Sequence, residues 1–343
     1  MTGNLTEMNI DYTNLVKKRN FNEHGPVVLT AIYHPMVQHS EGFCSLTHDS
    51  NKIHHDHPKY YDTISPGFLQ ASVANLLIAE AMSYVDLEAV DYVFSYDFSK
   101  MEKPVITGAD YKFEISLHAE QEKEEQQKGA FSVSAKLTNG EGDLVYVLDK
   151  TFYKAAGENF FPELDLNKYI HSSEFSSDGR FRILSSGRPI GSTILETNLL
   201  ALSASSSVIC DAIKEGNLRK IPEDPQDQTK NLVAMYDQQE VHAYACSNLD
   251  LREGVTLDLY ISDRFRFGKF TKPGETLDMK IVGRESNGRI LYTSTAPLSF
   301  PKAKGIDTLL KQEIRKRMKE REEPQEDKIQ AFFSQMKEEA VKE

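Results

Sequence analysis

Cysteine is scarce in this sequence and tryptophan is absent: the 343 residues include three cysteines and no tryptophan. Cys44, Cys210 and Cys246 lie far apart, and none belongs to a CxxC pair. This spacing excludes a disulfide scaffold and a zinc site built from cysteines. We therefore expect reduced thiols in a cytoplasmic protein.

Long hydrophobic runs and a surplus of positive charge are also missing. The most apolar stretches, Val73–Met82 and Ile194–Cys210, are too short or too mixed to span a bilayer, and residues 1–20 lack the pattern of a signal peptide. Forty basic against 52 acidic residues give a net charge of −12, which argues against a protein that coats nucleic acid or anionic lipid. With 39% apolar residues the chain can build a core. We expect a soluble monomer or homodimer without nucleic-acid or membrane partners.

The first half of the chain predicts antiparallel strands around one long helix. The β-branched run VVLTAIY from Val27 suits a buried strand. Ser65 and Pro66 are typical helix-start residues, and apolar residues follow at three- and four-residue spacings from Phe68 to about Val85. Alternating segments with turn signals between them then predict a series of hairpins.

The second half repeats this plan. TLDLYISDRFRF, TLDMKIVGRE and RILYTSTAPLSF predict further hairpins, and the segment Lys269–Ile281 resembles Lys103–Ile115. The pattern favours a second long helix at 190–213, after Pro189. The expected organisation is an N-terminal arm (1–25), two similar domains (26–157 and 158–301) and a charged helical tail (302–343).

Six of the ten histidines fall within His34–His57, and four of these six lie in the segment where the sequence is most specific. The stretch Leu46–Val73 reads LTHDSNKIHHDHPKYYDTISPGFLQASV. In it Asp49, Asn51 and His54 keep the spacing Asp-x-Asn-x-x-His, and Gly67 begins the expected long helix. This stretch resembles the MaoC-like, (R)-specific enoyl hydratase and dehydratase family, whose signature is Gly-Asp-x-Asn-Pro-x-His followed by His-Gly-Met at a helix start.

The resemblance implies an α+β class and a tandem hotdog fold, in which each half is a long helix wrapped by an antiparallel sheet. It implies that Asp49 and His54 are the catalytic acid and base, and that Asn51 orients their loop. Backbone N–H groups of Gly67 and Phe68, at the positive end of the helix, would stabilise an oxyanion. The substrate would be an acyl thioester of CoA or acyl carrier protein, with no cofactor.

Adding water across the double bond of an enoyl thioester gives an independent reason to expect such a pair. The reaction needs one group that activates water at C3 and another that moves a proton at C2. A carboxylate and an imidazole five residues apart on one loop could hold one water between them.

Other residues near the motif have weaker functional interpretations. Tyr60, Tyr61 and Ser72 are candidates for substrate binding. Several histidines and Asp56 around His54 also suggest a metal, but neighbouring loop side chains point apart and we expect no metal site. Candidate basic residues for the anionic carrier are Arg264, Arg266, Lys269 and Lys272, or Arg180, Arg182 and Arg188.

The leading hypothesis is a hydro-lyase: a 3-hydroxyacyl-thioester dehydratase or enoyl hydratase. Two alternatives stay open, a hotdog thioesterase or acyltransferase in which Asp49 activates water at the carbonyl, and a non-catalytic acyl-binding or assembly protein. They stay open because His48, Lys52 and Pro66 replace the glycine, the proline and the second histidine of the family pattern.

Overall fold

A computed structural model describes the parts of the chain that form one compact unit within residues 1–220 and 234–300. The described residues are 10–15, 27–47, 49, 54, 64–84, 93–118, 131–154, 160–161, 169–175, 194–215, 217, 235–236, 238–244, 255–267 and 275–299. The expected hairpin tip at 119–128 and the tail at 302–343 lie outside this set.

The first half builds an antiparallel sheet in the order β1-β2-β4-β5-β6-β3. Its strands are β1 (Ile10–Leu15), β2 (Val27–Tyr33), β3 (Phe94–Met101), β4 (Tyr111–His118), β5 (Phe131–Asn139) and β6 (Leu144–Tyr153). Its helices are α1 (Val37–Thr47) and α2 (Gly67–Tyr84). Ile10–Leu15 lies in the segment expected to form an arm, yet it pairs with β2 as an edge strand.

The second half has the strand order β9-β12-β11-β10-β7, with β8 paired to β12 outside this path. Its elements are β7 (Tyr169–Phe175), α4 (Ile194–Lys214), β8 (Met235–Tyr236), β9 (Gln238–Tyr244), β10 (Val255–Phe267), β11 (Glu275–Arg284) and β12 (Ile290–Ser299). The two long helices expected from the sequence are confirmed, with bounds that differ by a few residues.

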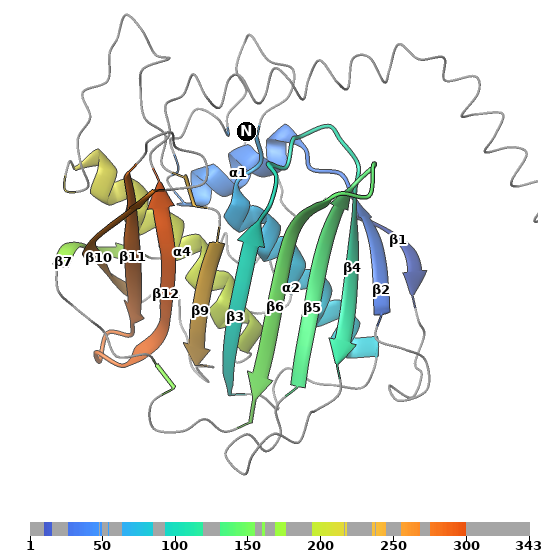
Figure 1. The fold of residues 1–343 in the computed structure, drawn as a ribbon. Helices are drawn as coiled ribbons and strands as arrows, with labels where there is room; N and C mark the ends of the chain where they lie inside the picture. Colours follow the sequence, from blue (N-terminus) through green and yellow to red (C-terminus); the bar gives the residue numbers. More distant parts are fainter. Residues whose placement is uncertain are drawn as a thin grey trace, which may run out of the picture. The chain divides into compact units, whose positions relative to one another are not determined.

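The two halves join through the antiparallel pair β3–β9, centred where Asp97 lies opposite Val241 (Figure 1). Outward from this pair the order is the same on both sides, so β6 corresponds to β12, β5 to β11 and β4 to β10. A repeat is therefore present, but the sequence match proposed above was wrong in register. It paired the segment leading into β4 with the segment leading into β11, because a glycine before an alternating strand recurs along the chain.

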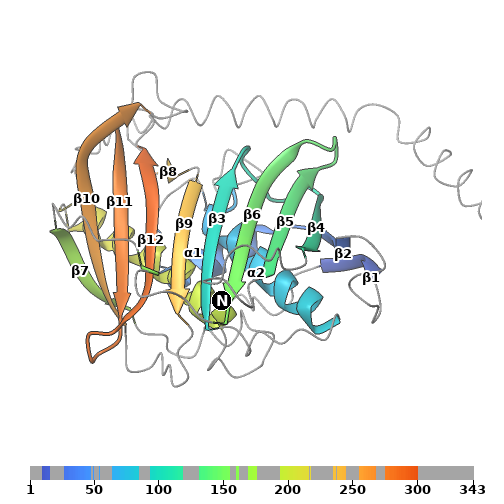
Figure 2. The same cartoon turned by 60° about the horizontal axis from the view of Figure 1, so that its bottom comes forward.

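Both long helices lie on the same face of the sheet (Figure 2). Helix α2 packs against β2, β4, β5 and β6, helix α4 packs against β7, β9, β10 and β12, and the two helices contact each other. Most side chains of α2 are buried all round the helix, as expected for a helix enclosed by other elements. Each fully buried aliphatic side chain, such as Leu69 or Ile78, contributes about 1.5–3 kcal/mol. Among the described helices, none is long and apolar enough to cross a membrane.

Candidate active site

Asp49 is held at the end of α1. Its backbone N–H donates to the carbonyl oxygen of Cys44 over 2.9 Å, and the Thr47 hydroxyl donates to the carbonyl of Phe43 over 3.0 Å. These contacts satisfy carbonyl groups that the last helical turn would otherwise leave without partners. The carboxylate side chain is 11% exposed, so the turn presents it to the protein interior.

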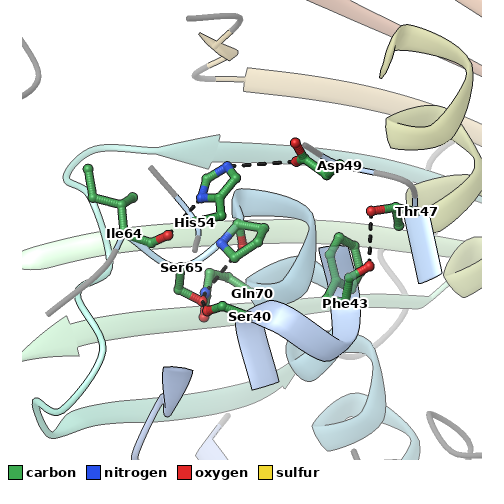
Figure 3. A network of polar contacts seen from close by, with 9 residues as sticks. Ser40, Phe43, Thr47, Asp49, His54, Ile64, Ser65 and Gln70 are labelled. Atoms are coloured by element: carbon green, nitrogen blue, oxygen red, sulfur yellow. Dashed lines mark hydrogen bonds and ion pairs between the residues drawn. The ribbon is translucent and has the colours of Figure 1, made fainter. Parts of the chain in front are cut away.

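His54 faces Asp49 with one ring nitrogen and is anchored by the other (Figure 3). Its Nδ1 lies 2.7 Å from the carbonyl oxygen of Ile64. Because a carbonyl can only accept, Nδ1 carries a proton and donates. In the neutral imidazole Nε2 then has the lone pair, and this atom lies 3.8 Å from Asp49 Oδ2. The arrangement gives a buried base beside a carboxylate, with a gap longer than a direct hydrogen bond.

Ile64 is itself fixed, which makes it a firm anchor for the imidazole. It forms an isolated antiparallel bridge with Ile106, and the backbone N–H of Ser65 donates to Val105 over 2.8 Å. His54 is therefore tied to the segment that leads directly into α2.

The start of α2 is ordered by buried polar contacts (Figure 3). The Gln70 amide donates to Ser65 Oγ over 2.7 Å, and the Ser40 hydroxyl donates to the same oxygen over 3.4 Å. Gly67 is half-buried and Phe68 is 2% exposed. The first amides of a helix lack intrahelical partners and carry its positive end, so this position can stabilise negative charge on a ligand oxygen.

A small pocket opens at this helix start. It has room for about one water molecule. Its lining comes from α2, β3, β6 and, across the joint between the halves, β9: Gly67, Phe68, Ala71, Ser99, Met101, Tyr146, Gln238 and Gln239. Asp49 and His54 are not among the lining residues.

The second half also reaches the carboxylate. The Cys210 thiol of α4 donates a hydrogen bond to Asp49, and burial raises the pKa of this thiol. Helices α1 and α4 pack together at this point. The Asp49–His54 pair thus lies among α1, α4 and the segment before α2.

The remaining candidates from the sequence divide into three groups. Asn51, Tyr60 and Tyr61 lie outside the described residues. Ser72 is buried within α2, where its hydroxyl donates to the Phe68 carbonyl over 2.8 Å, and it does not line the pocket. Among the basic candidates, Arg264 and Arg266 belong to strand β10, but the structure describes only their backbone. The other basic candidates lie outside the described residues.

The metal interpretation gains no support, and Cys44 is not suited to act as a nucleophile. Within the described ranges, no three His, Cys, Asp or Glu side chains gather as a metal site would require; His55 and His57 lie outside these ranges. Cys44 is 1% exposed, and burial raises the pKa of its thiol. A buried thiol with a raised pKa is a poor nucleophile.

No protein-family model and no curated protein sequence matches the chain. Among solved structures, the chain is similar to a MaoC-like dehydratase, with 11% identity, 78% of this chain and 95% of that chain covered, and a TM-score of 0.48. It is also similar to HtdX of Mycobacterium tuberculosis (11% identity, 78% and 98% covered, TM-score 0.44). A third similar structure is the tesB protein of Mycobacterium avium subs paratuberculosis, with 8% identity, 79% of this chain and 93% of that chain covered, and a TM-score of 0.45.

Sequence reasoning missed the pocket residues of the sheet. Tyr146 comes from β6, and Gln238 and Gln239 come from β9, more than ninety positions further along. None of them belongs to a motif. Only the register of the β3–β6 and β3–β9 pairs brings them to the start of α2.

Proposed function

We propose that the chain is a tandem hotdog enzyme that reversibly adds water to a 2-enoyl thioester, giving the 3-hydroxyacyl thioester. The acyl group would be carried by CoA or acyl carrier protein. The observation that carries this proposal is the facing pair His54 Nε2 and Asp49 Oδ2, 3.8 Å apart and nine-tenths buried, tied through Ile64 to the start of α2.

In this proposal the pair holds one water. Neutral His54 accepts a proton from this water at Nε2 as the water oxygen bonds to C3 of the substrate, and the Asp49 carboxylate stabilises the imidazolium that forms. His54 then gives the same proton to C2. One O–H bond of the water breaks, a C–O and a C–H bond replace the π bond of the substrate, and both side chains return to their starting state. The reverse sequence eliminates water.

The amides of Gly67 and Phe68 have the second role. As C3 is attacked, negative charge develops on the thioester oxygen, and donors fixed in advance stabilise it without reorganising. Gly67 has no side chain to hinder the approach of the thioester.

One observation favours thioester hydrolysis as a second candidate. The pocket that can hold a water adjoins the helix amides, where the thioester carbonyl would lie, and is separate from the Asp49–His54 pair. A water there would be placed for attack at the carbonyl carbon instead of C3.

Crotonyl-CoA distinguishes the two reactions. Hydration removes the absorbance of the conjugated double bond without releasing thiol, and hydrolysis releases free CoA. Asp49→Asn and His54→Asn keep similar shapes, and the asparagine amide at position 54 can still donate to Ile64. We expect hydration by the wild type and a loss of about 10²–10⁴-fold in kcat in each variant.

A matched control lies on the surface. His34 Nδ1 and Asp110 Oδ1 form another histidine–aspartate pair, 2.6 Å apart and exposed. His34→Asn and Asp110→Asn should leave the rate unchanged. Undiminished hydration in Asp49→Asn and His54→Asn would contradict the proposal, and rapid thiol release by the wild type would favour the thioesterase.

A further inference from the structure

Tyr146 carries a buried hydroxyl at the wall of the α2 pocket. The residue is 2% exposed, and its Oη has no hydrogen-bond partner among the described residues. The neighbouring Ser99 hydroxyl on the same wall acts on Tyr146 only as a donor, which lowers the pKa of Tyr146 and supplies no acceptor for its O–H. A buried hydroxyl without a partner is unfavourable, so its presence beside a cavity indicates that a ligand supplies the missing acceptor.

Two other tyrosines show what is particular about Tyr146. The hydroxyls of Tyr33 and Tyr292 are also buried without a hydrogen-bond partner, but both residues are 0% exposed in the core and neither lines the pocket. Tyr146 alone among these three combines an unsatisfied donor with an open space.

The pocket also limits what the ligand atom can be. Its room for about one water molecule suits a single oxygen atom. The positive end of α2 at Gly67 favours an oxygen with negative charge. Gln239, another lining residue, already donates its amide to Ser294 over 2.7 Å.

We propose that Tyr146 Oη donates a hydrogen bond to the thioester carbonyl oxygen of the substrate, and completes the oxyanion site formed by the amides of Gly67 and Phe68. This inference rests on the proposed acyl-thioester function and adds a third donor, from β6. Burial raises the pKa of Tyr146, and nearby Asp97 raises it further. The hydroxyl therefore keeps its proton at neutral pH and acts as a donor.

Tyr146→Phe removes only this hydroxyl, and Tyr292→Phe is the matched control. Each change deletes a buried hydroxyl that has no partner, so both variants should fold with a Tm equal to or above that of the wild type. We expect Tyr146→Phe to lower kcat for crotonyl-CoA on the order of 10²-fold. Butyryl-CoA has no double bond to hydrate, and calorimetry should show its Kd raised by roughly 10-fold in the same variant, as for a lost hydrogen bond. Tyr292→Phe should match the wild type in both measurements.

The two measurements separate this inference from the proposed function. If the wild type hydrates crotonyl-CoA and Tyr146→Phe is as active and binds butyryl-CoA as tightly, the role of Tyr146 is wrong and the function stands. If the wild type does not hydrate crotonyl-CoA, the function is wrong. In that case weaker butyryl-CoA binding in Tyr146→Phe still supports the inference, and equal binding, or no binding by the wild type, overturns it.

Discussion

At the scale of single residues, hydrogen-bond partners decide which atoms can do chemistry. The carbonyl of Ile64 fixes a proton on His54 Nδ1 and so directs the basic Nε2 towards Asp49. Asp49 in turn accepts from the Cys210 thiol of the other half. The Tyr146 hydroxyl is the complementary case, because its O–H lacks an acceptor and we propose that the substrate supplies one.

Buried tyrosines also predict how stability responds to alkaline pH. Burial raises the pKa of Tyr33, Tyr146 and Tyr292 above the ordinary value of 10.0, which the unfolded chain keeps. Above pH 10 the unfolded state loses protons that the folded state retains, so the free energy of unfolding falls as pH rises. Each group accounts for up to about 1.4 kcal/mol per pH unit. Denaturant titrations at pH 8, 10 and 11 should show this fall, with a shallower slope in Tyr292→Phe. An identical slope in that variant would refute this explanation.

At the scale of elements, the start of α2 positions both the amides of the proposed oxyanion site and the anchor of His54. It depends on the buried bond from Gln70 to Ser65, which the Ser40 hydroxyl extends to α1. The long helix itself was predictable, because Ser65-Pro66 and the apolar spacing are local signals. The contacts that hold its first turn were not, since Ser40 is 25 residues away in sequence.

Gln70→Ala tests this arrangement. It removes the 2.7 Å donor of the buried Ser65 hydroxyl and leaves only the longer Ser40 contact, and the loss of one such hydrogen bond costs about 0.5–1.5 kcal/mol. We expect urea titration to show a loss of that size, together with a reduced kcat as the helix start loosens. A variant as stable and as active as the wild type would show that the contact does not order this turn.

At the scale of the whole described unit, the two halves share one plan but differ where their helices begin. The strand register relates the two halves residue by residue. Ser95 of β3 corresponds to Gln239 of β9, and Lys150 of β6 corresponds to Ser294 of β12. At the start of α2, Gln239 lines the pocket and donates to Ser294. Near the start of α4, Lys150 donates to Asp97 over 2.6 Å and to Asn198 over 2.7 Å, and Asn198 donates to Ser95 over 2.9 Å. This polar network lies at the corresponding place beside α4, and it links the two halves of the sheet.

Breaking the network should destabilise both halves together. Asp97 and Lys150 are 4% and 1% exposed, and burial raises the pKa of the carboxyl and lowers that of the amine. Lys150→Met leaves Asp97 buried without its partner, so we expect a loss of about 3–5 kcal/mol. Adding Asp97→Leu to Lys150→Met should restore part of the lost free energy of unfolding. A double-mutant cycle measures this interaction energy. Additive losses in the double variant would show that the two charges do not depend on each other.

The difference between local and long-range signals explains what the sequence could predict. The spacing of Asp49 and His54 along one loop was visible, and the structure brings these side chains together. The joining of β3 to β9, and with it Tyr146 and Gln239 at the pocket, depends on pairing between distant strands that no local pattern encodes. The internal match chose β11 instead of β10 because successive hairpins carry the same turn and alternation signals.

The most direct test of the central claim is the rate at which purified protein removes the absorbance of crotonyl-CoA, measured for the wild type, Asp49→Asn, His54→Asn and the surface control His34→Asn. The account predicts hydration by the wild type and the surface control, and a loss of about 10²–10⁴-fold in the two site variants, which should stay folded. Equal rates in all four proteins, or no hydration by the wild type, would contradict it.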